Sequence, residues 1–418
     1  MRRRRVLAGC ATAVGLAGCL GGNDEEAVPT ATRVAPPTST PTDTGTETER
    51  PPRSGETTHI GGSLNGRPFR IGDDLGMVEA SETQWLHAFL DVRGKYERGR
   101  SPWEDRDVLA LRAAKRDLGV KLVVSLQWDF IGLFGSKGAE HVPPAGSARE
   151  RGLIDYGRQL LSAIDPSVDV VVLGNEPIWE TPDADLLEGD SPVVPFTRRL
   201  KDHLVEHYEA DDTTYLVGAF NRLYGQHIRE KYAGIYGQLF EFARTDEDVA
   251  GIDLHVHYAD FAEAERMLEV ARDRFPHGTI TVTEFSPMWR YDRHKNESIA
   301  SFEEGDRFAE RYGVPGDATV AEFLEAAKHE PITSEEMADF METMPWYNVD
   351  FVGDMHDLLS AHDVSVGTFG YLAGLGLRNE DWTDDWAPFP INCLFQPVLI
   401  DTEYGAHPYY MDDFRDLA

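Results

Sequence analysis

The stretch LRAAKRDLGVKLVVSLQW, residues 111–128, indicates a helix that leads directly into a strand. Its first half completes a helical pattern over Asp105–Leu118, in which apolar residues recur three and four positions apart. Its second half, Lys121–Trp128, is a short run rich in β-branched and apolar residues, as buried strands are. Parallel α/β sheets are built from such units, so this stretch predicts an α/β protein.

The same alternation continues along the chain from about residue 60. Eight runs have strand character: Pro68–Gly72, Trp85–Val92, Lys121–Trp128, Asp169–Leu173, Thr214–Ala219, Gly251–Tyr258, Thr279–Glu284 and Val364–Tyr371. Helical spacing lies between them, for example over Ala148–Ile164, Phe196–Tyr208, Arg229–Ala243, Phe261–Phe275 and Asn348–Ala361. Capping boxes are expected at Ser81 with Gln84, Thr319 with Glu322, and Thr333 with Glu336.

Eight strand–helix repeats predict a closed (β/α)8 TIM barrel, with an open doubly wound sheet as the alternative. No G-x-G-x-x-G sequence follows the first predicted strand, which disfavours a dinucleotide site. The connection after the seventh strand, from about Trp289 to Pro345, is long and predicts an insertion with two helical pieces that walls the C-terminal face. Asn296 begins a glycosylation sequon within it, in keeping with an exposed loop.

The first 58 residues have the composition of an export signal and a stalk rather than of a fold. Arg2–Arg5 precede a short apolar run, which predicts a signal peptide over 1–19 suited to twin-arginine export. Leu16–Cys19 resembles a lipobox, so Cys19 is the expected lipidation site, with an uncleaved membrane anchor as the alternative. Residues 20–58 are rich in Thr, Pro and Glu and predict a disordered stalk. Residues 59–418 would then form one catalytic domain on the extracellular face of the membrane.

Charge and cysteine content narrow the possible partners. The chain carries 73 acidic and 40 basic residues, a formal net charge of −33. A nucleic-acid partner is disfavoured because phosphate binding needs a basic face, and the acidity instead suits a solvated surface in high salt. If Cys10 is removed and Cys19 is lipidated, only Cys393 remains, so no disulfide framework is expected.

Two glutamates follow apolar strands where barrels collect their functional groups. The fourth run ends in Asn175-Glu176-Pro177, and the seventh ends in Thr283-Glu284-Phe285. Desolvation at the rim is expected to raise the pKa of Glu176 and make it a proton donor. Strand alternation is expected to point Glu284 the same way as Ile280 and Val282. Two such glutamates suit a retaining glycosidase, which needs two carboxyls about 5–5.5 Å apart. The alternative is that each glutamate forms a structural ion pair.

These two motifs together resemble those of clan A glycoside hydrolases, of family 5 or a related family. The resemblance implies that Glu176 is the acid/base, Glu284 the nucleophile, and Asn175 a contact to the sugar 2-hydroxyl. The resemblance extends over roughly residues 65–400 in the order of strands and helices, but only short motifs match residue by residue. The chain departs from family 5 at the third strand, where Ser125–Trp128 lacks the usual His, and at the eighth, where Tyr371 stands near the usual Trp.

Further residues are nominated around this pair. In the sixth run Asp253, His255 and His257 alternate with apolar residues, so the polar set should face the barrel interior. The resemblance implies that His257 or Tyr258 hydrogen-bonds the nucleophile, and that Arg93 matches a strand-two Arg. Tryptophans near strand ends can stack on sugars or serve as core. The substrate-binding set is therefore Asn175, Arg93, His257, Tyr258, Trp128, Trp179, Trp289 and Tyr371; Trp346, Trp382 and Trp386 are further stacking candidates.

The sequence thus predicts a lipid-anchored, retaining glycoside hydrolase of β-linked oligo- or polysaccharide, with no cofactor or metal. A barrel that binds carbohydrate without cleaving it is one alternative. The other is a metal-dependent, amidohydrolase-like barrel, because His-x-His on a barrel strand also binds zinc. That family carries the pair on strand one, whereas the first predicted strand here has Asp73 and Asp74 beside it but no His pair.

Overall fold

A computed structural model describes residues 57–64, 71–132, 136–165, 168–187, 190–208, 212–372 and 391–418. The chain divides into two units, Met1–Gly55 and Glu56–Ala418, and every described residue belongs to the second. The signal peptide, Cys19, nearly all of the stalk, Trp382 and Trp386 therefore lie outside the described residues. Among those that are described, no helix is both long and apolar enough to cross a membrane.

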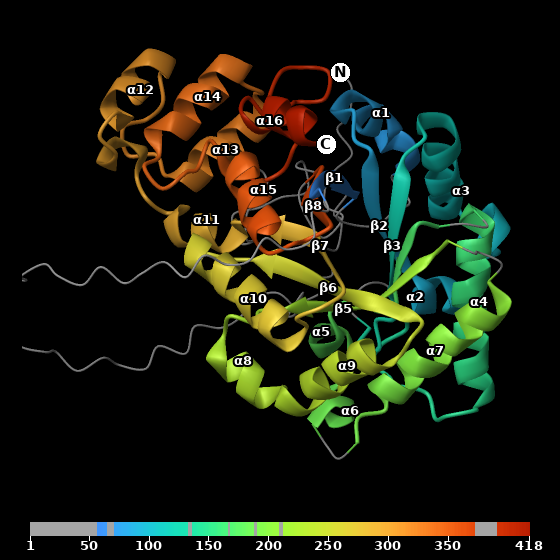
Figure 1. Ribbon diagram of the computed structural model, residues 1–418. Helices are drawn as coiled ribbons and strands as arrows, with labels where there is room; N and C mark the ends of the chain where they lie inside the picture. Colours follow the sequence, from blue (N-terminus) through green and yellow to red (C-terminus); the bar gives the residue numbers. More distant parts are fainter. Residues whose placement is uncertain are drawn as a thin grey trace, which may run out of the picture. The chain divides into compact units, whose positions relative to one another are not determined.

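The second unit is a closed parallel barrel of eight strands in sequence order, which confirms the predicted (β/α)8 fold (Figure 1). The strands are β1 His59–Leu64, β2 Trp85–Asp91, β3 Lys121–Gln127, β4 Val170–Val172, β5 Thr214–Asn221, β6 Val249–His257, β7 Thr279–Ser286 and β8 Val366–Gly370. The ring closes where β1 pairs with β8, from His59 opposite Val366 to Ser63 opposite Gly370.

Helices surround this ring. They are α1 Ile71–Ser81, α2 Val92–Glu97, η2 Pro102–Glu104, α3 Arg106–Ala113, η3 Ala114–Leu118, α4 Ala148–Ile164, α5 Pro177–Glu180, α6 Asp183–Leu187, α7 Val193–His207, α8 Gln226–Lys231, α9 Ala233–Thr245, α10 Phe261–Arg274, α15 Phe351–Ala361 and α16 Tyr410–Leu417. Apolar residues from both strands and helices form one core between the two layers. The prediction for α4 matches its observed bounds, and most others differ by a few residues at their ends. The single helix predicted over Arg229–Ala243 is wrong, because this stretch is divided between α8 and α9.

The prediction for the first strand is wrong. Ile71 and Gly72 begin α1, and β1 is the earlier segment HIGGSL. Its two glycines make it read as an extension of the stalk, but both are needed for close packing. A Cβ at Gly62 would lie 2.1 Å from the ring of Tyr371, and one at Gly61 would lie 2.6 Å from the carbonyl oxygen of Trp85.

Two of the predicted helix starts are confirmed and one is wrong. Thr319 and Glu322 form both halves of a capping box at α13, and the Thr333 hydroxyl accepts from the amide of Glu336 at α14. Ser81 instead ends α1, and its hydroxyl is bonded to the carbonyl of Val78 and to the hydroxyl of Tyr371.

The segment between β7 and α15 holds more helix than predicted. It contains α11 Met288–His294, η4 Ile299–Ser301, α12 Gly305–Tyr312, α13 Val320–His329 and α14 Ser334–Thr343, with α12 to α14 gathered together in Figure 1. These helices enclose an apolar cluster of their own, which includes Phe308, Phe340 and the buried Trp346. Trp346 is thus a core residue of the insertion, which contradicts a role in sugar stacking.

Candidate active site

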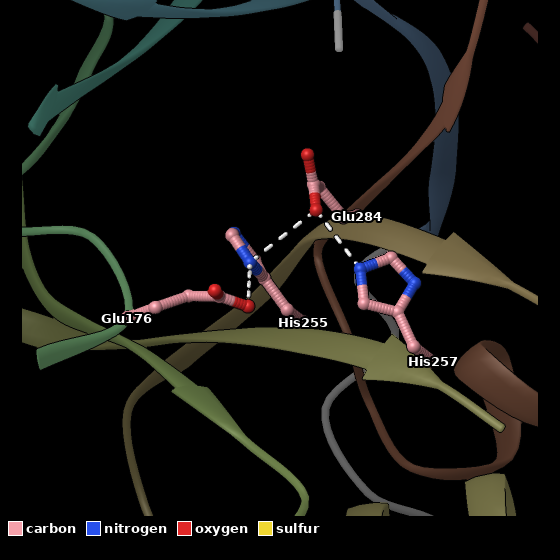
Figure 2. Close-up of side chains that lie close together, drawn as sticks. All are labelled: Glu176, His255, His257 and Glu284. Carbon is pink, nitrogen blue, oxygen red and sulfur yellow. Dashed lines mark hydrogen bonds and ion pairs between the residues drawn. The ribbon is translucent and has the colours of Figure 1, made fainter. Parts of the chain in front are cut away.

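The carboxyl ends of β4, β6 and β7 bring four polar side chains together. Figure 2 shows Glu176 after β4, His255 and His257 on β6, and Glu284 on β7, all pointing toward one another. One ligand atom from each of the four lies within 4.8 Å of every other. Two glutamates that are 108 positions apart in sequence therefore meet at one point inside the barrel mouth.

A bulge in β7 turns Glu284 toward the barrel interior. Leu254 of β6 pairs with Val282, but the next residue, His255, pairs with Glu284, so Thr283 is an extra residue in the ladder. Ile280 and Val282 pack in the layer between strands and helices, whereas Glu284 reaches the interior histidines. The expectation that Glu284 shares their direction is wrong, because the bulge reverses the alternation, as bulges beside active sites do.

Glu176 reaches the interior through an unusual backbone conformation. Its φ of 33° lies in the left-handed region, which non-glycine residues seldom adopt and which occurs at sites where a side chain must be aimed. Pro177 follows at once and begins α5. The Glu176 side chain is 19% exposed and that of Glu284 is 14% exposed, so each carboxylate is mostly buried yet open on one side.

His255 lies between the two glutamates. Its Nδ1 is 2.9 Å from an oxygen of Glu176 and 3.4 Å from an oxygen of Glu284, and its side chain is 1% exposed. His257 is a second partner of the same carboxylate, with Nε2 2.9 Å from Glu284. Sequence reasoning placed His255 in the barrel interior but nominated His257 and Tyr258, not His255, as partners of the nucleophile.

The charges of this cluster are strongly coupled. Burial alone would lower the pKa of His255, but the negative charges of Glu284 and Glu176 outweigh it and raise the pKa to about 9. Burial alone would raise the pKa of Glu176, but the hydrogen bond and positive charge of His255 outweigh it, so the pKa lies below its ordinary value. The expected upward shift for Glu176 is therefore wrong for the free protein, and at neutral pH the shared proton resides on His255.

Asp253 lies on β6, two residues before His255, and is hydrogen-bonded to β7. Its carboxylate accepts from the hydroxyl of Thr281 at 2.6 Å and from the hydroxyl and amide of Thr283 at 2.6 and 3.1 Å. Burial raises its pKa to about 6, although the charge of His255 and the threonine hydrogen bonds act in the opposite direction. These bonds fix Thr283, the bulged residue, and with it the direction of Glu284.

Four of the nominated substrate contacts are engaged elsewhere in the protein. Arg93 is buried and bonds Glu97, Glu140 and the carbonyls of Asp129 and Gly138. Trp128 is buried against Phe196, and its indole N–H donates to the carbonyl of Leu173. These predictions are wrong because Trp128 packs against a helix and Arg93 is bonded to the loop after β3.

The same is true of two tyrosines at the ends of β6 and β8. The hydroxyl of Tyr258 is 3.6 Å from the sulfur of Met355, so His257 and not Tyr258 contacts the nucleophile candidate. The hydroxyl of Tyr371 is 2.7 Å from that of Ser81. Both tyrosines are about 1% exposed, and as substrate contacts both predictions are wrong.

Asn175 also faces away from the cluster. Its amide nitrogen donates to Glu180 at 2.7 Å, and its oxygen is buried without a hydrogen-bond partner among the described residues. Glu180 accepts from Gln127 and from the backbone of Trp128 as well, and burial raises its pKa to about 8. The expected contact between Asn175 and a sugar hydroxyl finds no support in this arrangement.

Trp179 and Trp289 remain at the mouth, on α5 and α11. Both are partly exposed, and the guanidinium of Arg222 lies between them, 5.1 Å from one ring and 5.0 Å from the other. Asn221, at the end of β5, hydrogen-bonds Glu176. Sequence reasoning missed Asn221 and Arg222, although both follow an apolar strand run, the same signal that selected the two glutamates.

The four clustered residues also have the ligand types of a zinc site, two imidazoles and two carboxylates. Histidines that bind a resident metal normally donate their other ring N–H to an acceptor. Here Nε2 of His255 and Nδ1 of His257 are buried without a partner among the described residues. The nearer nitrogens already bond carboxylates, so the set fits a proton-sharing cluster better than a resident metal site.

Comparisons with known proteins add no family assignment. No family model and no curated protein matches the chain. Among solved structures, it is similar to a psychrophilic glycoside hydrolase family 10 endo-β-1,4-xylanase, with 13% identity, 87% of this chain and 97% of that one covered, and a TM-score of 0.48. A mannanase catalytic domain from Streptomyces sp. SirexAA-E gives 15% identity, 57% and 72% coverage, and a TM-score of 0.38. A prophage protein of the dihydrodipicolinic acid synthase family from E. coli gives 12% identity, 74% and 87% coverage, and a TM-score of 0.31.

Proposed function

We propose that this chain is a retaining glycoside hydrolase that cleaves β-linked oligo- or polysaccharide. The observation that carries the proposal is the approach of Glu176 and Glu284, whose facing oxygens lie within 4.8 Å across His255. Retaining enzymes place their two carboxyls about 5–5.5 Å apart, whereas inverting enzymes leave about 6.5–9.5 Å for a water molecule. The gap favours direct attack by one carboxylate on the sugar.

In the first step Glu284 attacks the anomeric carbon, and a bond forms between its oxygen and that carbon as the glycosidic C–O bond breaks. Glu176 delivers a proton to the leaving oxygen. Because the pKa of Glu176 is lowered and that of His255 is raised to about 9, the proton is held on Nδ1 of His255 before substrate binds. Its hydrogen bond to Glu176 provides the route to the acid.

In the second step water hydrolyses the glycosyl-enzyme. Glu176 is now an anion and accepts a proton from the attacking water, and Glu284 is released as a carboxylate. His257 hydrogen-bonds Glu284 and stabilises its charge as it leaves. The chain's own residues thus account for both proton transfers.

The amino-acid sequence of residues 1–58 supports the proposal that the protein is anchored outside the cell. A signal peptide over 1–19 and a lipobox Cys19 would anchor the barrel to the membrane through the 20–58 stalk, on the extracellular face. Cys19→Ser removes the thiol to which the lipid would be attached, and should release the protein from the membrane fraction if this is right. A protein that stays membrane-bound after Cys19→Ser would favour an uncleaved anchor.

The test of function is hydrolysis of aryl β-glycosides and of β-glucans, mannans and xylans by wild-type protein and by Glu284→Gln. We expect one substrate class to be cleaved by wild-type protein and the cleavage to be lost in the variant. Full activity in the variant would overturn the nucleophile assignment. Binding of a polysaccharide without product release would instead favour a non-catalytic carbohydrate-binding protein.

Metal-dependent hydrolysis is a second candidate, favoured only by the ligand types of the four clustered residues. Extensive dialysis against a chelator separates the two. The proposed mechanism predicts unchanged activity after chelation and no gain on adding Zn²⁺. Loss of activity on chelation, with recovery on adding back one metal, would favour the metal-dependent reaction.

A further inference from the structure

Arg222 is the most distinctive charged group near the clustered glutamates. It follows the last residue of β5 with a φ of 48°, a conformation that lies in the left-handed region. Its guanidinium carbon lies 5.1 Å from the centre of the Trp179 ring and 5.0 Å from that of Trp289. Both contacts are within cation–π range.

The topology places this group beside the catalytic candidates. Trp179 lies three residues after Glu176, and Trp289 lies five residues after Glu284. Arg222 comes from β5, which stands between β4 and β6 in the ring. The three side chains therefore join the segments that follow β4, β5 and β7, around the same side of the barrel mouth as the glutamate pair.

Arg222 differs in its partners from three other arginines of the barrel. Arg93, Arg149 and Arg199 each bond one or more carboxylates. For Arg222, no carboxylate of the described residues lies within ion-pair distance, and two indole rings lie close to its guanidinium. In a chain with 73 acidic and 40 basic residues, an arginine beside the site without an acidic partner is unexpected.

The N–H groups of Arg222 are what a ligand can bind. Both indole rings lie close to the guanidinium, and none of its N–H groups donates to another described residue, so the donors along its planar edge remain for a ligand. That edge matches the two oxygens of a carboxylate, and such paired, charge-assisted hydrogen bonds are among the strongest in proteins. Arg222 is also only partly exposed, which reduces the competition from water.

We propose that Arg222, held between Trp179 and Trp289, binds the carboxylate of a uronic-acid unit in the substrate. The inference rests on the proposed function and narrows it to acidic β-linked saccharides. A sulfate ester presents related anion chemistry, but its tetrahedral oxygens match the planar guanidinium edge less closely than a carboxylate does. A neutral sugar would offer the cation only hydroxyl groups.

The experiment compares matched pairs of aryl β-glycosides that differ only at C6. Glucuronide is paired with glucoside and galacturonide with galactoside, and a 6-O-sulfated glycoside forms the third arm. We expect wild-type kcat/KM to be higher for the acidic member of a pair. Arg222→Gln should lower kcat/KM for the uronide roughly 10- to 100-fold, the range for one charge-assisted hydrogen bond, and change that for the neutral glycoside by less than about 3-fold.

Two further variants keep the result interpretable. Arg222→Lys retains the charge without the planar fork and should fall between wild type and Arg222→Gln on the uronide. Arg293→Gln is the control, because it removes an exposed cation from α11. The Arg293 side chain is 60% exposed and its ion pair with Glu263 is long, at 3.9 Å, so both activities should stay unchanged. Thermal unfolding of each variant identifies any loss that comes from misfolding.

The outcomes separate this inference from the proposed function. Glu284-dependent cleavage without preference for the uronide, or equal losses on both members of a pair in Arg222→Gln, overturns the inference and leaves the hydrolase intact. Preference for the sulfated arm overturns the carboxylate assignment. If no glycoside is cleaved, the hydrolase proposal fails, and tryptophan fluorescence during titration with a β-1,4-linked oligomannuronate decides the inference: quenching lost in Arg222→Gln supports it, and no response in wild-type protein contradicts it.

Discussion

The two halves of the barrel mouth differ in their strand-end residues: several on the β4–β7 half reach the interior, although Asn175 and Tyr258 there do not. On the β4–β7 half, Glu176, His255 and Glu284 enter the interior and contact one another. On the β8–β3 half, Arg93 bonds the loop after β3 and Tyr371 bonds Ser81 at the end of α1, so both side chains are held by the scaffold. The difference shows that position at a strand end does not define a site; the direction of the side chain does.

The largest expected difference is in kcat, between a glutamate variant on the β4–β7 half and one on the β8–β3 half. Glu176→Gln removes the proton donor, and we expect kcat to fall roughly a hundred- to ten-thousand-fold on a substrate with a poor leaving group. Glu140→Gln makes the same change in the loop after β3, where Glu140 pairs with Arg93 and Arg149. Steady-state kinetics of that variant should match wild type within about twofold, because a partly exposed ion pair contributes little to stability.

Equal losses in the two variants would erase the contrast between the halves. Activity of Glu176→Gln close to that of wild type, on any substrate that wild type cleaves, would remove Glu176 from the reaction.

The second effect concerns the pH profile. His255 has its pKa raised to about 9, so it stays protonated through neutral pH, and we expect wild-type kcat/KM to fall only as pH rises through about 9. In His255→Asn the two carboxylates face each other without the imidazolium of His255 between them, and the proton is shared by two acids. The alkaline limb should move at least about one unit toward acid, because the pKa of such a carboxyl pair stays well below that of the histidine.

His257→Asn is the matched comparison, because it leaves His255 between the glutamates. Its kcat/KM should be lower than that of wild type, with the alkaline limb unmoved. An alkaline limb in His255→Asn at the wild-type position would show that the proton is not held on this histidine.

The smallest effect is expected on the β8–β3 half. Tyr371→Phe removes the hydroxyl bonded to Ser81, and Ser81 keeps its bond to the carbonyl of Val78. The free energy of unfolding should fall by about 1 kcal/mol, the net value of one hydrogen bond, while KM and kcat stay unchanged. Denaturant unfolding measures the change in stability, and steady-state kinetics measures KM and kcat. A raised KM would show that Tyr371 contacts the substrate.

Much of the fold was predictable because strands β2 to β8 are bounded apolar runs. β1 was not, since its glycines at 61 and 62 serve contacts with Trp85 and Tyr371 that no local pattern reveals. The glutamate pair was predictable from two motifs. The bulge at Thr283 was not, because it depends on pairing between β6 and β7.

The remaining site residues needed three-dimensional contacts. His255 and His257 look alike in sequence, and only their positions show that His255 lies between both carboxylates. The role proposed for Arg222 depends on its contacts with two tryptophans, which are 43 residues before it and 67 residues after it in sequence. Trp128 and Trp179 were equally plausible stacking residues, but Trp128 lies in the helix layer.

The anomeric configuration of the first-formed product tests the glutamate pair most directly. Proton NMR of a cleaved β-glycoside, recorded before the product mutarotates, resolves the two anomers. Direct attack by Glu284 across the observed gap predicts that the β-anomer appears first. Initial release of the α-anomer would mean a single displacement by water and would contradict the assignment of Glu284 as the nucleophile.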